Sequence, residues 1–245
     1  GEVGILVGTR LDPLLSGASV FVSQAGEING NVVDVAGSDG IHVYTDAFAG
    51  SDATAVLSQT LAINDNVVSN VDQYEFQSGH HGGIVVENHI DGHVSASQGL
   101  TIDPNTVSGV SNGGDGIFVY TSVAGASVTQ AINIASNVVL GAVDGIHVRT
   151  IVDYASFGTA VSQALQIAGN TAIGAEKNGI EVNNFVRNTG HGSIGLSQSA
   201  FIAGNVVSDT GEQGILVHSV VYAVRGAFFT GDGSANLSQT LQIVS

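Results

Sequence analysis

Acidic side chains recur immediately before one short sequence, and this placement could bind a metal ion. Asp39, Asp115 and Asp144 each precede a Gly-Ile-x-Val segment. If these segments are equivalent strands, Asp115 and Asp144 lie one strand apart, where two carboxylates repel unless a cation or a proton intervenes. Carboxylate oxygens are ligands that Ca²⁺ prefers. Asp115 and Asp144 are therefore candidate metal ligands, with calcium as the candidate ion.

Imidazole side chains form a second candidate metal site. The chain has eight histidines, and four of them lie in the segment GHHGGIVVENHIDGHV, residues 79–94. A histidine-rich segment can bind Zn²⁺, Ni²⁺ or Cu²⁺, but a structural zinc site wants four fixed ligands and the chain has no cysteine. A metal site and a set of exposed loop histidines both remain open; the residues concerned are His80, His81, His89 and His93.

One group of residues is a candidate catalytic site. Asp144, His147 and Arg149 lie on one expected coil, with Asp115 and Tyr120 on the coil before it. An acid, an imidazole and a guanidinium could serve general acid and base chemistry on a sugar. The chain, however, has only five Lys and Arg residues and a net charge of -16, which would repel an anionic polysaccharide. We therefore predict no enzyme and assign no catalytic residue beyond these three candidates.

The elements that position these residues repeat along the whole chain. A Ser-Gln or Thr-Gln pair occurs seven times at spacings of 32 to 41 residues, always with Ile four residues after the Gln. An Asn follows seven residues after each of the first six glutamines, and a Gly-Ile-x-Val segment alternates with these copies. The glutamines are Gln24, Gln59, Gln98, Gln130, Gln163, Gln198 and Gln239; the asparagines are Asn31, Asn66, Asn105, Asn137, Asn170 and Asn205.

The repeat predicts an all-β fold. Each period contains three short segments of β type separated by turns, with no helical stretch between them, which is typical of a parallel β-solenoid with one coil per repeat. The series of two-residue hairpins that an antiparallel sandwich needs is absent. We expect one domain over residues 1–245 with about seven coils, in which the Ile and Val of Gly-Ile-x-Val point inward and the x residue points outward.

A family resemblance supports this fold. The pattern Ile-x-x-Asn-x-Val, a turn and then Gly-Ile-x-Val resembles the right-handed parallel β-helix repeat of pectate-lyase-like proteins, bacterial secreted adhesins, autotransporter passengers and phage tailspikes. The resemblance extends over essentially the whole chain and implies a right-handed β-helix. It implies no single function, because that fold occurs in enzymes and non-enzymes alike.

Two columns of amides are expected inside the solenoid. In β-helices of the kind this chain resembles, a turn asparagine forms an internal ladder, and its amide can donate to one neighbour while accepting from the other. The glutamines alternate in phase with the inward Ile, so they too point inward, and a buried amide needs a hydrogen-bond partner. A Gln above a Gln supplies one. We therefore predict an Asn ladder and a Gln ladder.

Composition excludes several classes of partner. The scarcity of basic residues leaves no patch for phosphates, so nucleic-acid binding is not expected. The longest apolar runs are too short to cross a bilayer, so membrane insertion is not expected either. Without cysteine there is no disulfide framework. Acidity together with the lack of cysteine fits an extracellular or cell-surface protein.

These observations lead to one expected function and one alternative. We expect a structural surface solenoid, a fragment or processed subunit of an extracellular protein, that acts as an adhesin or stacks end to end into filaments. Its partners would be copies of itself, surface glycans or other cell-surface proteins, contacted through loops such as residues 67–82 and outward side chains. The alternative is a carbohydrate-active β-helix enzyme or a glycan-binding module like a tailspike.

Overall fold

A computed structural model describes residues 3–12, 17–71, 81–111, 113–153, 158–188, 192–223 and 234–244. All regular elements within these residues are β-strands. Among them, no helix is long and apolar enough to cross a membrane. The expectation of an all-β chain is therefore confirmed for the described residues.

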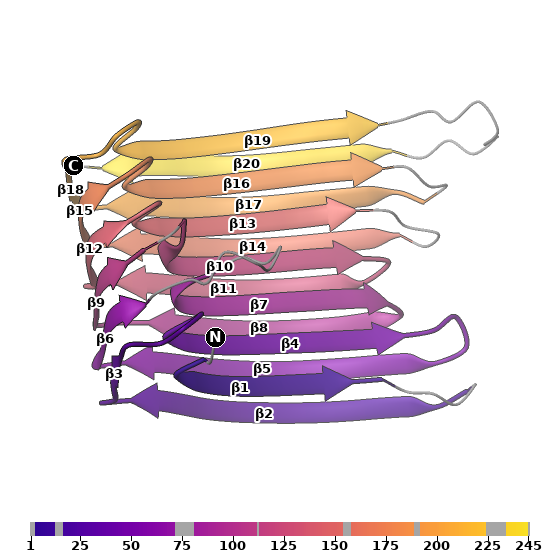
Figure 1. Cartoon of the computed structure of the whole chain (residues 1–245). Helices are drawn as coiled ribbons and strands as arrows, with labels where there is room; N and C mark the ends of the chain where they lie inside the picture. The colour runs from indigo at the N-terminus through magenta and orange to yellow at the C-terminus, as the bar shows by residue number, and fades with distance from the viewer. Residues whose placement is uncertain are drawn as a thin grey trace.

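The strands form three parallel sheets, stacked in chain order along one axis (Figure 1). Sheet A contains β1 (Ile5–Leu11), β4 (Ile41–Ala49), β7 (Gly82–Gly92), β10 (Asp115–Ala124), β13 (Ile146–Asp153), β16 (Ile180–Asn188) and β19 (Ile215–Ala223). Sheet B contains β2 (Ser19–Asn29), β5 (Thr54–Asn64), β8 (Val94–Ile102), β11 (Ser127–Ala135), β14 (Thr159–Ala168), β17 (Ile194–Ala203) and β20 (Ala235–Val244). Sheet C contains β3 (Val32–Asp34), β6 (Asn66–Val71), β9 (Asn105–Val110), β12 (Val138–Ala142), β15 (Thr171–Ala175) and β18 (Val206–Ser208).

Each repeat is one turn of a parallel β-solenoid. The register pairs equal positions of successive repeats, so that Ile41 lies beside Ile84 and Gln59 beside Gln98. Sheet C has six strands where sheets A and B have seven. The solenoid therefore makes about six turns, one fewer than the number of Gln motifs indicates.

The interior is divided into two apolar clusters. The first contains the Ile and Val of the Gly-Ile-x-Val strands together with the Ile that follows each Gln, such as Ile41, Val43 and Ile63. The second lies nearer the other end of the strands and contains more alanines, such as Ala47 and Ala55. Along β4 and β5 the residues between the two clusters are Thr45 and Gln59, which are themselves buried. A polar layer thus crosses the core.

Five of the six turns before the sheet C strands have a left-handed residue, and the exception is the turn before β9, where Pro104 precedes Asn105. The residue that precedes Asn66 is Asp65 (φ 53°), and the one that precedes Asn170 is Gly169 (φ 65°). Small or Asx residues tolerate this conformation best. In these five turns the left-handed position is the residue before the ladder asparagine.

Two of the side chains expected to be solvent-facing are buried instead. Val85 and Phe118 occupy the x position of Gly-Ile-x-Val, yet both are 0 % exposed. The ring of Phe118 packs against Tyr120 and meets the edge of His147 at a centroid distance of 5.0 Å. Val85 lies between His42 and Phe118 in the register, so its neighbours on adjacent turns cover it. Side chains on the outer side of sheet A therefore bury one another.

We predict that the Asn ladder contributes strongly to stability. Replacing Asn137 with Ala should lower the free energy of unfolding by about 3 kcal/mol, because Asn137 is 0 % exposed and its loss removes one hydrogen bond each from Asn105 Nδ2, Asn170 Oδ1 and the Ile102 carbonyl. Urea unfolding measures this change. The matched control is Asn133→Ala, since Asn133 is half-buried and its Oδ1 already lacks a partner. Equal losses in the two variants would contradict the prediction.

Candidate functional site

The predicted Asn ladder is present and runs in one direction. Each Asn Nδ2 donates to the Oδ1 of the Asn on the next turn at 2.9 to 3.0 Å, from Asn31 through to Asn205. From Asn66 onward, Nδ2 also donates to the carbonyl oxygen of an Ile on the preceding turn at 2.7 to 2.9 Å. From Asn66 to Asn170 both amide hydrogens are then used. These six asparagines are architectural.

The predicted Gln ladder is also present and runs in the opposite direction. Each Gln Nε2 donates to the Oε1 of the Gln on the preceding turn, from Gln239 back to Gln24, at 2.5 to 3.4 Å. The two amide columns therefore have opposed polarity along the axis. Their dipoles offset each other instead of adding.

A third column partners the glutamines and was missed from the sequence. The second residue after the Gly-Ile-x-Val valine points inward from sheet A and bonds to the facing Gln, as Thr45 does to Gln59 at 3.1 Å and Asn184 to Gln198 at 2.9 Å. This position can form hydrogen bonds in every repeat, which is the sequence signal that could have found it. The residues are Thr9, Thr45, Asn88, Thr121, Thr150, Asn184 and Ser219.

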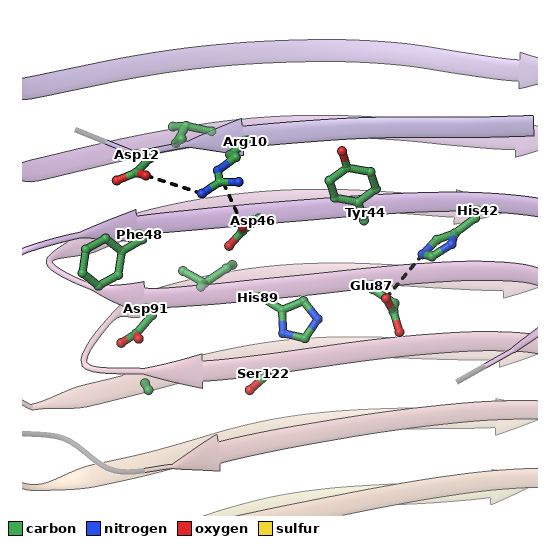
Figure 2. Close-up of a pocket in the computed structure, with 13 residues that line it drawn as sticks. Arg10, Asp12, His42, Tyr44, Asp46, Phe48, Glu87, His89, Asp91 and Ser122 are labelled. Atoms are coloured by element: carbon green, nitrogen blue, oxygen red, sulfur yellow. Dashed lines mark ion pairs between the residues drawn. The ribbon is translucent and has the colours of Figure 1, made fainter. Parts of the chain in front are cut away.

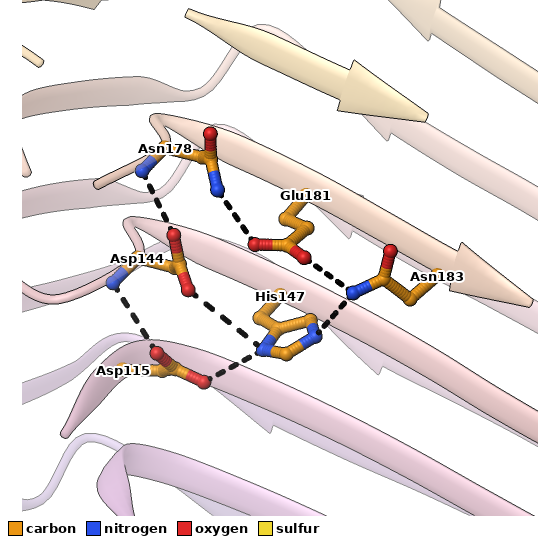
Figure 3. Close-up of polar contacts among 6 residues, drawn as sticks. All are labelled: Asp115, Asp144, His147, Asn178, Glu181 and Asn183. Atoms are coloured by element: carbon orange, nitrogen blue, oxygen red, sulfur yellow. Dashed lines mark hydrogen bonds and ion pairs between the residues drawn. The ribbon is translucent and has the colours of Figure 1, made fainter. Parts of the chain in front are cut away.

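Outside the ladders, two aspartates and a histidine meet at the turn before sheet A (Figure 3). His147 Nδ1 lies 2.9 Å from Asp115 Oδ2 and 4.0 Å from Asp144 Oδ2. One ligand atom from each residue lies within 4.8 Å of the others, and this is the one such group of three found among the described residues. The two candidate metal ligands Asp115 and Asp144 are thus brought together with His147.

Turn geometry explains why the two carboxylates stack. Asp115 Oδ1 accepts the backbone N–H of Asp144 at 3.2 Å, and Asp144 Oδ1 accepts the N–H of Asn178 at 2.8 Å. Each carboxylate therefore bonds to the turn above it. Burial raises the pKa of Asp144 to about 6; the backbone N–H of Asn178 opposes this shift, and the charges of Asp115 and Glu181 add to it.

A related arrangement occurs near the other end of sheet A. The sequence Asp-Gly-Ile-His occurs at residues 39–42 and again at 144–147. In the first copy His42 lies between two carboxylates, with Nδ1 3.1 Å from Asp39 and Nε2 3.3 Å from Glu87. Burial lowers the pKa of His42, but hydrogen bonds to Asp39 and Glu87 outweigh burial and raise it to about 9. His42 is therefore a stable cation at neutral pH.

The third catalytic candidate has different contacts from the other two. The guanidinium of Arg149 lies over the ring of Phe185 at 5.4 Å, and its Nε is buried without a hydrogen-bond partner. No ion pair in the described part of the chain connects Arg149 to Asp144. The structure thus brings Asp144 and His147 together but gives Arg149 a separate aromatic contact.

The histidine-rich segment does not gather into a metal site where it is described. His81 Nδ1 lies 3.5 Å from Asp39 Oδ1, while His89 is exposed and tilts against the ring of Tyr120. His93 lies in the turn between β7 and β8. His80 and most of the expected binding loop 67–82 lie outside the described residues. The described histidines of this segment belong to no group of three potential ligands.

The outer faces of the two long sheets differ sharply in chemistry. Glu27 is the single charged residue in the strands of sheet B, whose outward positions are mostly Ser, Thr, Ala and Gly. Each strand of sheet A from β4 to β16 contains at least three residues that are acidic, basic, histidine or aromatic. The sequence alone did not separate these faces, because both sets alternate with the same period.

A groove crosses the outer face of sheet A over β1, β4, β7 and β10 (Figure 2). It has a volume of about 620 Å³. Tyr44 and Phe48 are 37 % and 46 % exposed there, beside the ion pair of Arg10 with Asp46. The Tyr44 ring lies over Gly8, where a Cβ atom would collide with it. The carboxylates lining the groove are Asp12, Asp46, Glu87 and Asp91.

Comparisons with family models, with curated proteins and with solved structures give no match to this chain. The assignment as a parallel β-solenoid rests on its own repeat and geometry.

We predict that Asp144 makes stability depend on pH. Its pKa is about 6 in the folded protein and 3.8 when unperturbed, so its contribution to folding is full below pH 4 and declines as the pH rises through 6. Asp144→Asn removes this decline. In a chelating buffer, the stability of this variant relative to wild type should increase by on the order of 2 kcal/mol between pH 4 and pH 7. Urea unfolding at both pH values checks this, and a difference that does not change with pH would contradict it.

Proposed function

We propose that the chain is a structural β-solenoid of the cell surface that presents the outer face of sheet A to a binding partner, as an adhesin does. One observation carries this proposal: charged, histidine and aromatic side chains are concentrated in sheet A, whereas the strands of sheet B contain Glu27 as their single charge. The inward polar side chains are already paired in ladders. Chemistry that is available to a partner is therefore concentrated on one face.

The groove favours a glycan as the partner. Exposed rings such as Tyr44 and Phe48 can stack on the apolar face of a sugar, and neighbouring carboxylates can accept its hydroxyl hydrogens. Four carboxylates against Arg10 and the charged His42 make the groove acidic, which favours a neutral glycan over an anionic one. Binding is favoured over cleavage because Asp144, His147 and Arg149 do not line this groove.

The expected experiment is binding of the purified chain to a glycan array and to intact cells. Tyr44→Ala with Phe48→Ala should weaken binding at least tenfold by removing both exposed rings, and Gly8→Ala should weaken it by displacing Tyr44. Phe201→Ala is the matched control, since Phe201 is 38 % exposed on sheet B. Absence of binding, or a loss confined to the Phe201 variant, would overturn the proposal.

We also propose that the chain can stack on copies of itself head to tail. β1 and β2 at one end, and β19 and β20 at the other, each pair on one side within the described residues. At the first end Gln24 Nε2 donates to no described residue, and at the last Gln239 Oε1 accepts from Ser219 alone. A donor and an acceptor thus meet only when unlike ends face each other, which gives an open, heterologous contact.

Leu241→Lys tests this stacking. Leu241 occupies an inward position of β20, and its partner in the register on β17 is the buried Ala200. A charge there should keep the protein monomeric at concentrations where the wild type elongates, as followed by light scattering and electron microscopy. Phe201→Lys places the same charge on the side of the solenoid and should leave elongation unchanged. A monomeric wild type, or equal elongation of both variants, would contradict the prediction.

A further inference from the structure

We propose that Asp115, Asp144 and His147 bind one divalent transition-metal ion, with Zn²⁺ as the reference, and that this ion connects the turns containing β10 and β13. The proposal concerns this cluster alone and does not depend on the adhesin role. It identifies His147 as a ligand, and it replaces calcium with a metal that prefers nitrogen as well as oxygen.

The spacing of the three residues suits a single ion. His147 Nδ1 is 2.9 Å from Asp115 Oδ2 and 4.0 Å from Asp144 Oδ2, and all three ligand atoms lie within 4.8 Å of one another. Metal-ligand bonds of about 2.0 to 2.2 Å allow two ligands of one ion to be up to roughly 4 Å apart. Small side-chain rotations would therefore complete the site, with water in the remaining positions.

One carboxylate oxygen of the cluster accepts no hydrogen bond from a described residue. Asp144 Oδ1 accepts the N–H of Asn178, but no described residue donates a hydrogen bond to Oδ2, although the Asp144 side chain is only 6 % exposed. The imidazole hydrogen at Nδ1 can serve one oxygen, and Asp115 Oδ2 is nearer by about 1 Å. A carboxylate oxygen without a donor, on a side chain so little exposed, favours a nearby proton or cation.

Comparison with the first Asp-Gly-Ile-His copy shows what is special about the second. On the solenoid turn that precedes Asp39, the residue equivalent to Asp39 is Val3. On the solenoid turn that precedes Asp144, the equivalent residue is a second carboxylate, Asp115. The two histidines also differ at the other ring nitrogen, Nε2. Nε2 of His42 faces the carboxylate of Glu87, whereas Nε2 of His147 faces the amide of Asn183. In the second copy both carboxylates therefore lie near one ring nitrogen, Nδ1, and the imidazole does not have a carboxylate at each of its two nitrogens.

The ligand types point to a transition metal. Ca²⁺ takes six to eight oxygen ligands, while imidazole with carboxylates suits Zn²⁺ and its neighbours. Binding requires a lone pair on Nδ1, so the proton at Nδ1 leaves to solvent or passes to Nε2. Asn183 Oδ1 is buried without a partner, and rotation of its amide would turn this oxygen toward Nε2–H. Glu181 would then keep its bond from Asn178.

The test is calorimetric titration of the chelator-treated chain with Zn²⁺ and Co²⁺, together with the Co²⁺ absorption spectrum, which reports nitrogen ligation. Wild type should bind one ion that His147→Gln and Asp144→Asn each weaken at least tenfold. His42→Gln is the matched control and should retain this site. Each variant is first shown to unfold cooperatively in chelator, so that a loss of binding is not a loss of folding.

Two results would overturn the proposal. The first is unchanged Zn²⁺ and Co²⁺ binding in His147→Gln and Asp144→Asn, or no binding in wild type. The second is Ca²⁺ binding that survives His147→Gln and is lost in Asp144→Asn, which would define an all-oxygen calcium site. Neither result would bear on whether the groove binds a partner, because Asp115, Asp144 and His147 do not line it.

Discussion

Hydrogen bonding between identical amides on successive turns is the interaction on which the rest of this structure depends. Parallel strands repeat at about 4.8 Å, and an amide can donate to one neighbour and accept from the other at that spacing. Asn31 to Asn205 form one such column and Gln24 to Gln239 another. If one solenoid turn shifted its register by a single residue, its ladder amide would lose the hydrogen bonds to the amides above and below it. The columns therefore fix the register that the apolar stacks alone specify less sharply.

The ladders also determine where binding chemistry can lie. Inward polar side chains form hydrogen bonds with one another, as Gln59 does with Gln24, Gln98 and Thr45. These groups are therefore already used and do not offer hydrogen bonds to a ligand. Outward-facing side chains are then free to differ from one repeat to the next. The outer residues of the two long sheets differ: sheet B has small uncharged side chains, whereas sheet A has aromatic rings and charges. This difference is the reason why we propose sheet A as the face for recognition.

Stacking also concentrates charge where a turn residue is acidic in two successive repeats. Asp115 and Asp144 are held one above the other by backbone N–H groups, whatever their mutual repulsion, because each carboxylate satisfies the turn above it. The hydrogen bonds that hold the turns thus place two carboxylates close together, where a cation would reduce their repulsion. At Asp39 the same turn lacks an acidic neighbour below it, and the imidazolium of His42 balances the charges of Asp39 and Glu87 instead.

The sequence by itself determined the repeat, the parallel solenoid, both amide columns and the inward Ile and Val, because each follows from a spacing repeated every turn. Tertiary structure decided the properties that depend on neighbours across turns. These include burial of Val85 and Phe118 by adjacent side chains, the meeting of His147 with Asp115 and Asp144, and the separate contact of Arg149 with Phe185. It also decided that Thr45 and its equivalents face the glutamines across the core. Which residues of sheet A lie opposite which residues of sheet B depends on how the whole coil closes, and neither strand determines this alone.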